Sequence, residues 1–143
     1  MCPDSGAIAF VAPRSFAPDV EVKESEASRQ GVHYRHAGGG LIPNEGEKDV
    51  HSVDINGGSC KSTWQLANTT KPLASVIAMV KAGNRVVFDQ HEGENISHIL
   101  NKESGNTIPI EEVNNQYEFD MFLPVKKGHE DAGRNGCCTR GGE

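Results

Sequence analysis

The sequence lacks long apolar runs and an excess of basic residues. Its longest apolar stretches, near residues 7–12 and 73–80, are too short to cross a membrane as a helix. No basic residue precedes the first of them, which argues against a secretory signal. The 14 Lys and Arg are outnumbered by 20 Asp and Glu, for a net charge of -6. Since nucleic-acid-binding modules are usually basic, we expect no direct nucleic-acid contact and no membrane association.

The sequence also lacks cysteine or histidine spacing typical of a metal site. No C-x-x-C pair occurs among its cysteines, which are Cys2, Cys60, Cys137 and Cys138. His33 and His36 are three residues apart, which puts them on opposite faces of a strand. We therefore expect no metal and no cofactor. Free thiols suit a reducing, intracellular compartment.

A chain of 143 residues leaves room for one domain, or for one domain plus a tail. Glycine and proline are plentiful in it. The 16 glycines and 7 prolines favour turn-rich β structure over a helix bundle. We therefore expect a mainly β fold.

Two hairpins are predicted in the first half of the chain. Residues 32–35 and 41–42 read as short strands on either side of a glycine-rich tip. Residues 50–55 and 60–67 alternate apolar and polar side chains around the turn Asn56-Gly57-Gly58. The second hairpin should bury Trp64 and Leu66.

One helix is predicted at residues 72–82. Pro72 stands before an apolar pattern with helical spacing and Gly83 follows it, which is the usual helix punctuation. We expect this helix to bury the apolar positions of that pattern, namely Leu73, Val76, Ile77 and Val80.

Short strands should follow the helix. The predicted strands are residues 86–88, 96–100, 107–110 and 117–123. In the last of them Tyr117, Phe119, Met121 and Leu123 share one face, which predicts a half-buried strand. Residues 124–143 have no periodicity and are predicted to be a disordered tail.

The motif with the clearest chemistry is Asp4-Ser5-Gly6-Ala7. An aspartic peptidase needs a carboxylate on a tight turn, followed by a hydroxyl residue and a glycine that lets the backbone pack behind the carboxylate. Two such carboxylates share one proton, so that one activates water while the other polarises the peptide carbonyl. The same tripeptide also forms ordinary turns, so the motif alone leaves both interpretations open.

The order of elements resembles a known family. The motif, a glycine-rich hairpin at Ala37–Gly40, a second hairpin and a helix beginning near Leu73 follow one another as in retropepsin-like aspartic peptidases. The chain is similar to the protease region of copia-type retroelement polyproteins, in which residues after the helix lead toward the integrase. The resemblance covers roughly residues 4–123 and implies a small β-barrel with one short helix.

This resemblance implies specific sites and parts. Residues 1–83 would be the protease-type domain, residues 84–123 a β extension similar to a pre-integrase segment, and residues 124–143 the tail. The implied catalytic residues are Asp4, Ser5 and Gly6, and the implied substrate-binding residues are Ala7, Ala37, Gly38, Gly39, Gly40 and Leu41. The glycine-rich hairpin would be the flap over the substrate, exposed and mobile without ligand.

One chain carries one such motif, so an active site would need two chains. The resemblance implies a homodimer through the Asp4 loop, acting on extended peptides at polyprotein junctions. Only Met1–Pro3 precede the motif, and Pro3 lacks an N–H for strand pairing. We therefore expect a chain truncated at its N-terminus, with weak or no activity.

Two alternatives stay open. The chain could be a non-catalytic, retroelement-derived β domain that serves as an interaction module. Alternatively, the part from about residue 84 could be a pre-integrase spacer that assists nucleic-acid work, although the acidic balance argues against direct DNA contact.

Overall fold

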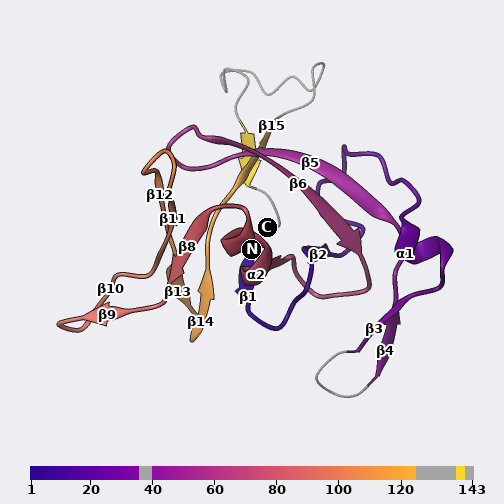
Figure 1. The fold of residues 1–143 in the computed structure, drawn as a ribbon, viewed down its shortest axis with the longest axis horizontal. Coiled ribbons are helices and arrows are strands. Elements are labelled where there is room, and N and C mark those ends of the chain that lie inside the picture. The colour runs from indigo at the N-terminus through magenta and orange to yellow at the C-terminus, as the bar shows by residue number, and fades with distance from the viewer. Residues whose placement is uncertain (36–39, 125–137, 141–143) are drawn as a thin grey trace.

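A long antiparallel hairpin, the central hairpin, forms the middle of the main sheet in the computed structural model, which describes residues 1–35, 40–124 and 138–140. It runs across the upper part of the view in Figure 1. Its strands are β5 (Glu47–Val53) and β6 (Ser59–Leu66), paired from Glu47–Gln65 to Val53–Ser59. Gly57 has a φ of 85° in the connecting turn, a conformation that glycine adopts without strain. The predicted hairpin is thus confirmed, although its strands begin and end a few residues from the predicted bounds.

This hairpin belongs to a curled, half-barrel sheet. The strand order is β1 (Cys2–Asp4), β7 (Leu73–Ser75), β2 (Val11–Ala12), β6, β5, β15 (Phe122–Pro124) and β16 (Cys138–Arg140). Strand β2 is parallel to β6 and antiparallel to β7. At the other side β15 (Phe122–Pro124) pairs with β5 through Phe122 and Val53. The expectation of a mainly β fold is confirmed.

The first strand, β1 (Cys2–Asp4), shows that the few residues before the motif pair in the sheet although Pro3 lacks an N–H. It runs parallel to β7, and the Cys2 N–H donates to Pro72 O at 3.1 Å. Successive N–H groups along a strand point to opposite edges, so the missing N–H of Pro3 lies on the edge away from β7. On that edge the Met1 and Phe119 backbones exchange hydrogen bonds of 2.8 and 2.9 Å.

The predicted helix is shorter than expected, and its buried face is different. Helix α2 spans Val76–Lys81 and ends at Ala82 and Gly83, the latter at a φ of 98°. Leu73 lies in β7 rather than in the helix. Met79 is buried, whereas Ile77 and Val80 are 48% and 46% exposed. The predicted burial of Ile77 and Val80 is therefore wrong, while Val76 packs against the core as expected.

A second, smaller hairpin stands apart from the main sheet. It consists of β3 (His33–Arg35) and β4 (Leu41–Pro43), which pair from His33–Pro43 to Arg35–Leu41. The short helix α1 (Glu26–Arg29) precedes it. The predicted glycine-rich hairpin therefore has its two strands, while its tip at residues 36–39 lies outside the described residues.

The chain after α2 forms small sheets. β11 (His98–Asn101) pairs with β8 (Asn84–Val87) and with β12 (Thr107–Pro109), close to the predicted strands. Two further hairpins, which were not predicted from the sequence, lie in the same part of the chain. They are β9 (Gln90–His91) with β10 (Glu94–Asn95), and β13 (Glu111–Val113) with β14 (Gln116–Glu118).

The single strand predicted at residues 117–123 is instead split into β14 and β15. Phe119 and Met121 lie between the two strands and are both buried, so the alternation of buried side chains persists without a continuous ladder. The predicted tail begins at Pro124, which the structure includes in β15. Within that tail Cys138–Arg140 forms β16, antiparallel to β15, and the rest lies outside the described residues.

One hydrophobic cluster joins residues from both sides of the predicted boundary at residue 83. Trp64 lies at its centre, with Phe10 and Phe16 rings at 5.0 and 4.7 Å between centroids. Phe119 and Met121 from the C-terminal part belong to the same cluster. The predicted burial of Trp64 and Leu66 is confirmed.

Candidate functional site

The Asp4-Ser5-Gly6-Ala7 motif forms a tight turn directly after β1. The Gly6 N–H donates to Asp4 Oδ1 at 2.8 Å, and the Ala7 N–H reaches Asp4 O at 3.4 Å. A Cβ at Gly6 would lie 3.3 Å from Asp4 Oδ1, so glycine allows the amide this close approach. The turn holds one carboxylate oxygen and leaves the half-buried Asp4 side chain partly open to solvent.

The turn is supported from behind by β7 and the start of α2. In the parallel register Asp4 lies opposite Ser75, which is fully buried. The Ser75 hydroxyl donates to Ala7 O at 2.7 Å and accepts from the Ala78 N–H at 3.1 Å. Segments about seventy residues apart in the sequence therefore meet at the motif.

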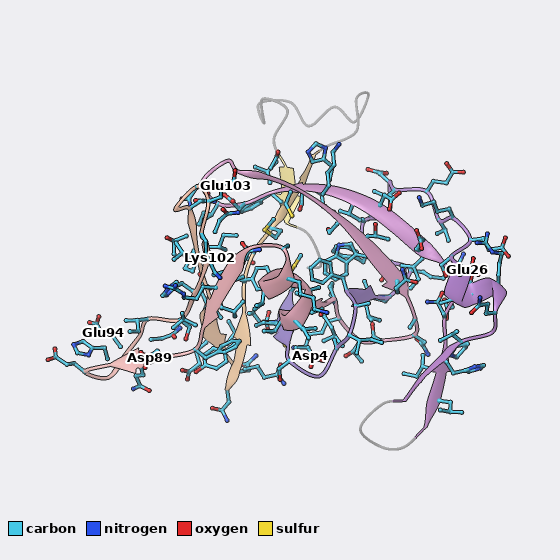
Figure 2. The ribbon with its side chains drawn as sticks, viewed as in Figure 1. Asp4, Glu26, Asp89, Glu94, Lys102 and Glu103 are labelled. Atoms are coloured by element: carbon cyan, nitrogen blue, oxygen red, sulfur yellow. The ribbon has the colours of Figure 1, made fainter. Side chains whose placement is uncertain are left out.

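Asp4 lies apart from several acidic side chains of the described residues. Figure 2 shows it well separated from four other carboxylates, those of Glu26, Asp89, Glu94 and Glu103. Among the described residues no group of three or more His, Cys, Asp or Glu side chains is arranged to hold a metal ion. None of these four carboxylates is therefore placed to share a proton with Asp4.

The expected substrate-binding residues are only partly gathered around Asp4. Ala7 belongs to the Asp4 turn and is half-buried. Leu41 is 61% exposed on the β3–β4 hairpin, which projects away from β1 and α2 (Figure 1). Gly40 begins the described part of that hairpin's second arm, and Ala37, Gly38 and Gly39 lie outside the described residues. The described strands of this hairpin do not cover Asp4 (Figure 1).

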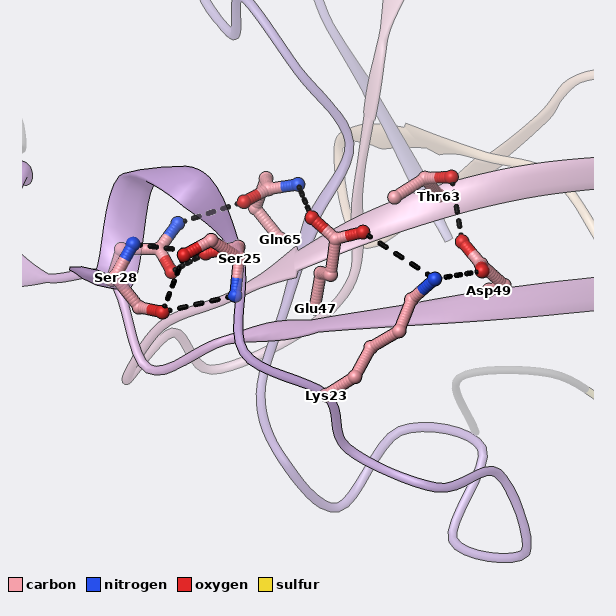
Figure 3. Close-up of polar contacts among 8 residues, drawn as sticks. Lys23, Ser25, Ser28, Glu47, Asp49, Thr63 and Gln65 are labelled. Atoms are coloured by element: carbon pink, nitrogen blue, oxygen red, sulfur yellow. Dashed lines mark hydrogen bonds and ion pairs between the residues drawn. The ribbon is translucent and has the colours of Figure 1, made fainter. Parts of the chain in front are cut away.

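A polar network ties the segment around α1 to the base of this hairpin and to the outer face of β5 and β6 (Figure 3). The Ser25 hydroxyl donates to Asn44 Oδ1 at 2.8 Å, and Asn44 Nδ2 donates to Gln65 Oε1 at 2.9 Å. The network continues from Gln65 to Glu47 at 3.3 Å. Asn44 also accepts from the Gly46 N–H, so it fixes the chain between β4 and β5.

The same face carries a charged pair. Lys23 hydrogen-bonds Asp49, and Thr63 Oγ1 donates to the second Asp49 oxygen at 2.8 Å. The hydrogen bond from Lys23, followed by that from Thr63, lowers the pKa of Asp49 below its ordinary value of 3.8. The same contact raises the pKa of Lys23.

Lys48 is a buried cation that sequence reasoning did not single out. Its ammonium donates to the carbonyls of Arg14, Phe16 and Ala17 at 2.8, 2.8 and 3.1 Å, and the residue is 2% exposed. Burial lowers the pKa of Lys48, and the nearby Arg14 charge lowers it further. Alternation along β5 places Lys48 on the inner face, a signal that the sequence already contains.

An apolar cavity in the described part of the chain does not include the motif. Its volume is about 660 Å³, and it lies between the central hairpin and the residues after α2. It is lined mostly by apolar side chains such as Phe10, Trp64, Met79 and Met121, with Asp54 and Glu103 among its polar residues. Asp4, Ser5 and Gly6 do not line it.

Asp54, one of the polar residues that line this cavity, is already hydrogen-bonded. Asp54 accepts from the Asn56 and Gly58 N–H groups and from Asn106 Nδ2. Within the described residues no buried side-chain nitrogen or oxygen lacks a hydrogen-bond partner. The cavity is thus mainly apolar, and the Asp54 carboxylate within it is not an unsatisfied group.

None of the helices in the described part of the chain has the length and apolar character needed to span a membrane.

In comparisons with protein families, curated proteins and solved structures, nothing matches this chain.

Proposed function

We propose that the chain is one half of a homodimeric aspartic endopeptidase of the retropepsin-like type. The observation that carries the proposal is the position of Asp4, at the end of a short strand and opposite the residue that begins α2. A carboxylate held on a tight turn by a following glycine N–H is what an Asp-Ser-Gly catalytic loop requires. The second carboxylate of the dyad would come from a second copy of the same loop.

Exposed apolar side chains near the motif support this pairing. Ile8 is 83% exposed directly after the Asp4 turn, and Ile77 is 48% exposed in the first turn of α2. The hydrogen bond from Ser75 to Ala7 joins the two segments on which they lie. A second chain covering these side chains would bury apolar area and bring two Asp4 carboxylates together.

In the proposed mechanism the two Asp4 carboxyls share one proton, because two like charges this close cannot both ionise. The ionised one takes a proton from water, which then attacks the peptide carbonyl. The protonated one donates a hydrogen bond to that carbonyl oxygen. The substrate would be an extended peptide, aligned by strand-like pairing.

The test is cleavage of an extended peptide library by the wild-type chain and by Asp4→Asn. We expect Asp4→Asn to abolish cleavage without loss of the fold or of the dimer, since it removes like-charge repulsion at the interface. Wild-type activity should be sensitive to a pepstatin-type inhibitor and follow a bell-shaped pH profile on the acid side of neutrality. Activity that survives in Asp4→Asn would refute the assignment.

Asp89→Asn is a matched control. Asp89 Oδ1 also accepts a backbone N–H, from Gln90 at 2.7 Å, and Figure 2 shows it far from Asp4. This variant changes the same chemical group and should leave cleavage unchanged.

A non-catalytic interaction module is the second candidate function. The observation in its favour is that the apolar cavity between the central hairpin and the residues after α2 does not include Asp4, so this cavity is not a substrate cleft for the motif. Sedimentation analysis together with the cleavage assay distinguishes the two candidate functions. A dimer that cleaves no peptide at any acid pH would support the interaction module.

A further inference from the structure

Ser75 occupies a position that links three features of the fold. It is the last residue of β7, the N-cap of α2 and the residue opposite Asp4 in the parallel register. Its side chain is fully buried. A buried hydroxyl at such a junction must find its hydrogen-bond partners inside the protein.

The partners of this hydroxyl lie on different segments. The Ala78 N–H is a donor, so the Ser75 oxygen accepts from it at 3.1 Å, as an N-cap does. The single hydroxyl hydrogen is then free to donate to Ala7 O at 2.7 Å. Capping α2 would be satisfied by the first bond alone; the second bond reaches the end of the Asp4 turn.

We infer that Ser75 is a positioning residue for Asp4, an inference that rests on the proposed function. The β1–β7 pairing holds the turn at Asp4, and the Ser75 hydroxyl holds it at Ala7. Between these two points lies Gly6, whose N–H orients Asp4 Oδ1. Ser75 touches neither the Asp4 carboxylate nor the substrate, so it acts through the geometry of the turn.

A purely structural role predicts a different result. If Ser75 only caps α2, its loss would lower overall stability and leave the Asp4 turn no more mobile than the rest of the fold. Ser25 provides a matched comparison, because it is the N-cap of α1, is 2% exposed and accepts from the Ser28 N–H at 2.9 Å. Its hydroxyl donates to Asn44 rather than to the Asp4 turn.

The experiment compares Ser75→Ala with Ser25→Ala in the full chain. NMR follows the amide shifts and hydrogen exchange of Gly6 and Ala7, and peptide cleavage gives kcat and KM. We expect Ser75→Ala to speed exchange at these amides about tenfold more than its loss of overall stability explains. The kcat should fall by about tenfold to a hundredfold with little change in KM. Ser25→Ala should change neither.

A conservative variant keeps the test informative if Ser75→Ala does not fold. Ser75→Cys is close in size and retains a weak donor and acceptor, so it should give a smaller change in the same amides. Equal behaviour of Gly6 and Ala7 in the Ser75 and Ser25 variants would overturn the positioning role. The amide measurements need no activity, so they test the positioning role of Ser75 even if the wild-type chain cleaves no peptide. A failure of the wild-type chain to cleave peptides would refute the proposed function but not the positioning role.

Discussion

At the scale of single residues, Lys48 has the most demanding environment in the described structure. A buried ammonium is costly unless it is hydrogen-bonded, and Lys48 meets this requirement with three backbone carbonyls from residues 14–17. Those carbonyls belong to an irregular loop in which Ala17 has a φ of 50°. The cation therefore holds a loop that lacks regular backbone pairing of its own.

Replacing Lys48 by methionine should destabilise the fold. The side chain keeps its approximate volume, but buried carbonyls lose their donor, which costs about 1–3 kcal/mol. Urea denaturation would measure the change. Lys61→Met, at an exposed position in the paired strand, should change stability by no more than about 0.5 kcal/mol. Equal stability of the two variants would contradict the role of Lys48.

The pH dependence of the Lys48 contribution follows from its lowered pKa. Between that lowered value and 10.5, the unfolded chain binds the extra proton and the folded chain does not. The stability of the wild-type chain should therefore rise with pH over this interval relative to Lys48→Met. The measurement is denaturation at a series of alkaline pH values. A stability difference between the wild-type chain and Lys48→Met that does not change with pH would contradict this interpretation.

Asp49 should titrate below 3.8 in the folded chain, because Lys23 and Thr63 stabilise its charged form. Its contribution to stability is present above 3.8 and is lost as the pH falls through the lowered value. NMR titration of the Asp49 carboxyl would give the midpoint. Lys23→Met should move that midpoint up toward 3.8, whereas Lys71→Met, which removes a half-buried amine from the loop before β7, should not.

At the scale of elements, the six residues of α2 show why periodicity alone is an incomplete guide. Leu73, Val76, Ile77 and Val80 have helical spacing, but the chain is still a strand at Leu73 because it pairs with β1. The helix therefore starts three residues later, and its contact with the core is through Val76 and Met79. The apolar spacing predicted one buried face of the helix, but the pairing of Leu73 with β1 shortened the helix, and a different face of α2 is buried.

Substitutions on α2 should separate the two faces. Met79→Ala should lower the free energy of unfolding by about 2–4 kcal/mol, since it removes a buried side chain that lines the apolar cavity. Ile77→Ser, at a side chain 48% exposed, should cost about 0.5 kcal/mol or less in the monomer. Thermal or urea denaturation at low protein concentration is the measurement, and a larger loss in Ile77→Ser would restore the helical face expected from the sequence.

The β3–β4 hairpin should be less stable than the central sheet. Each of its strands pairs only with the other, while β6 is flanked by both β5 and β2. The amides of β4 should therefore exchange faster with deuterium than the Trp64 amide. Exchange at Ile42 as slow as at Trp64 would contradict the prediction that this hairpin can open over a substrate.

At the scale of the whole molecule, local patterns were predictable and long-range pairings were not. The β5–β6 hairpin follows from alternation and the Asn-Gly-Gly turn, both of which are contained in one short segment. The pairing of Cys2–Asp4 with Leu73–Ser75 has no local signal, because a three-residue strand containing Pro3 carries no period. The Asp4 motif could thus be recognised from its residues, whereas its support by Ser75 could not.

The exchange of hydrogen bonds between Met1 and Phe119 has a consequence for the order of events during synthesis. The two residues are 118 positions apart, so β1 gains its second neighbour only after residue 119 has been made. A growing chain that exposes β7 and α2 but not Phe119 would hold the Asp4 strand on one edge alone. Since such distant contacts form late, the Asp4 turn would be completed after the chain around it.

Ribosome-arrested chains would test this timing. Chains that expose residues 1–83 should leave the Cys2 thiol readily alkylated, and chains that expose residues beyond 121 should protect it, because Cys2 is half-buried in the finished fold. Cys60, which is exposed, serves as the internal reference. Protection already complete in the shorter chains would show that β7 alone suffices. If the proposed chemistry is correct, late closure of β1 would delay the assembly of two Asp4 turns into an active site until residue 119 of each chain had been synthesised.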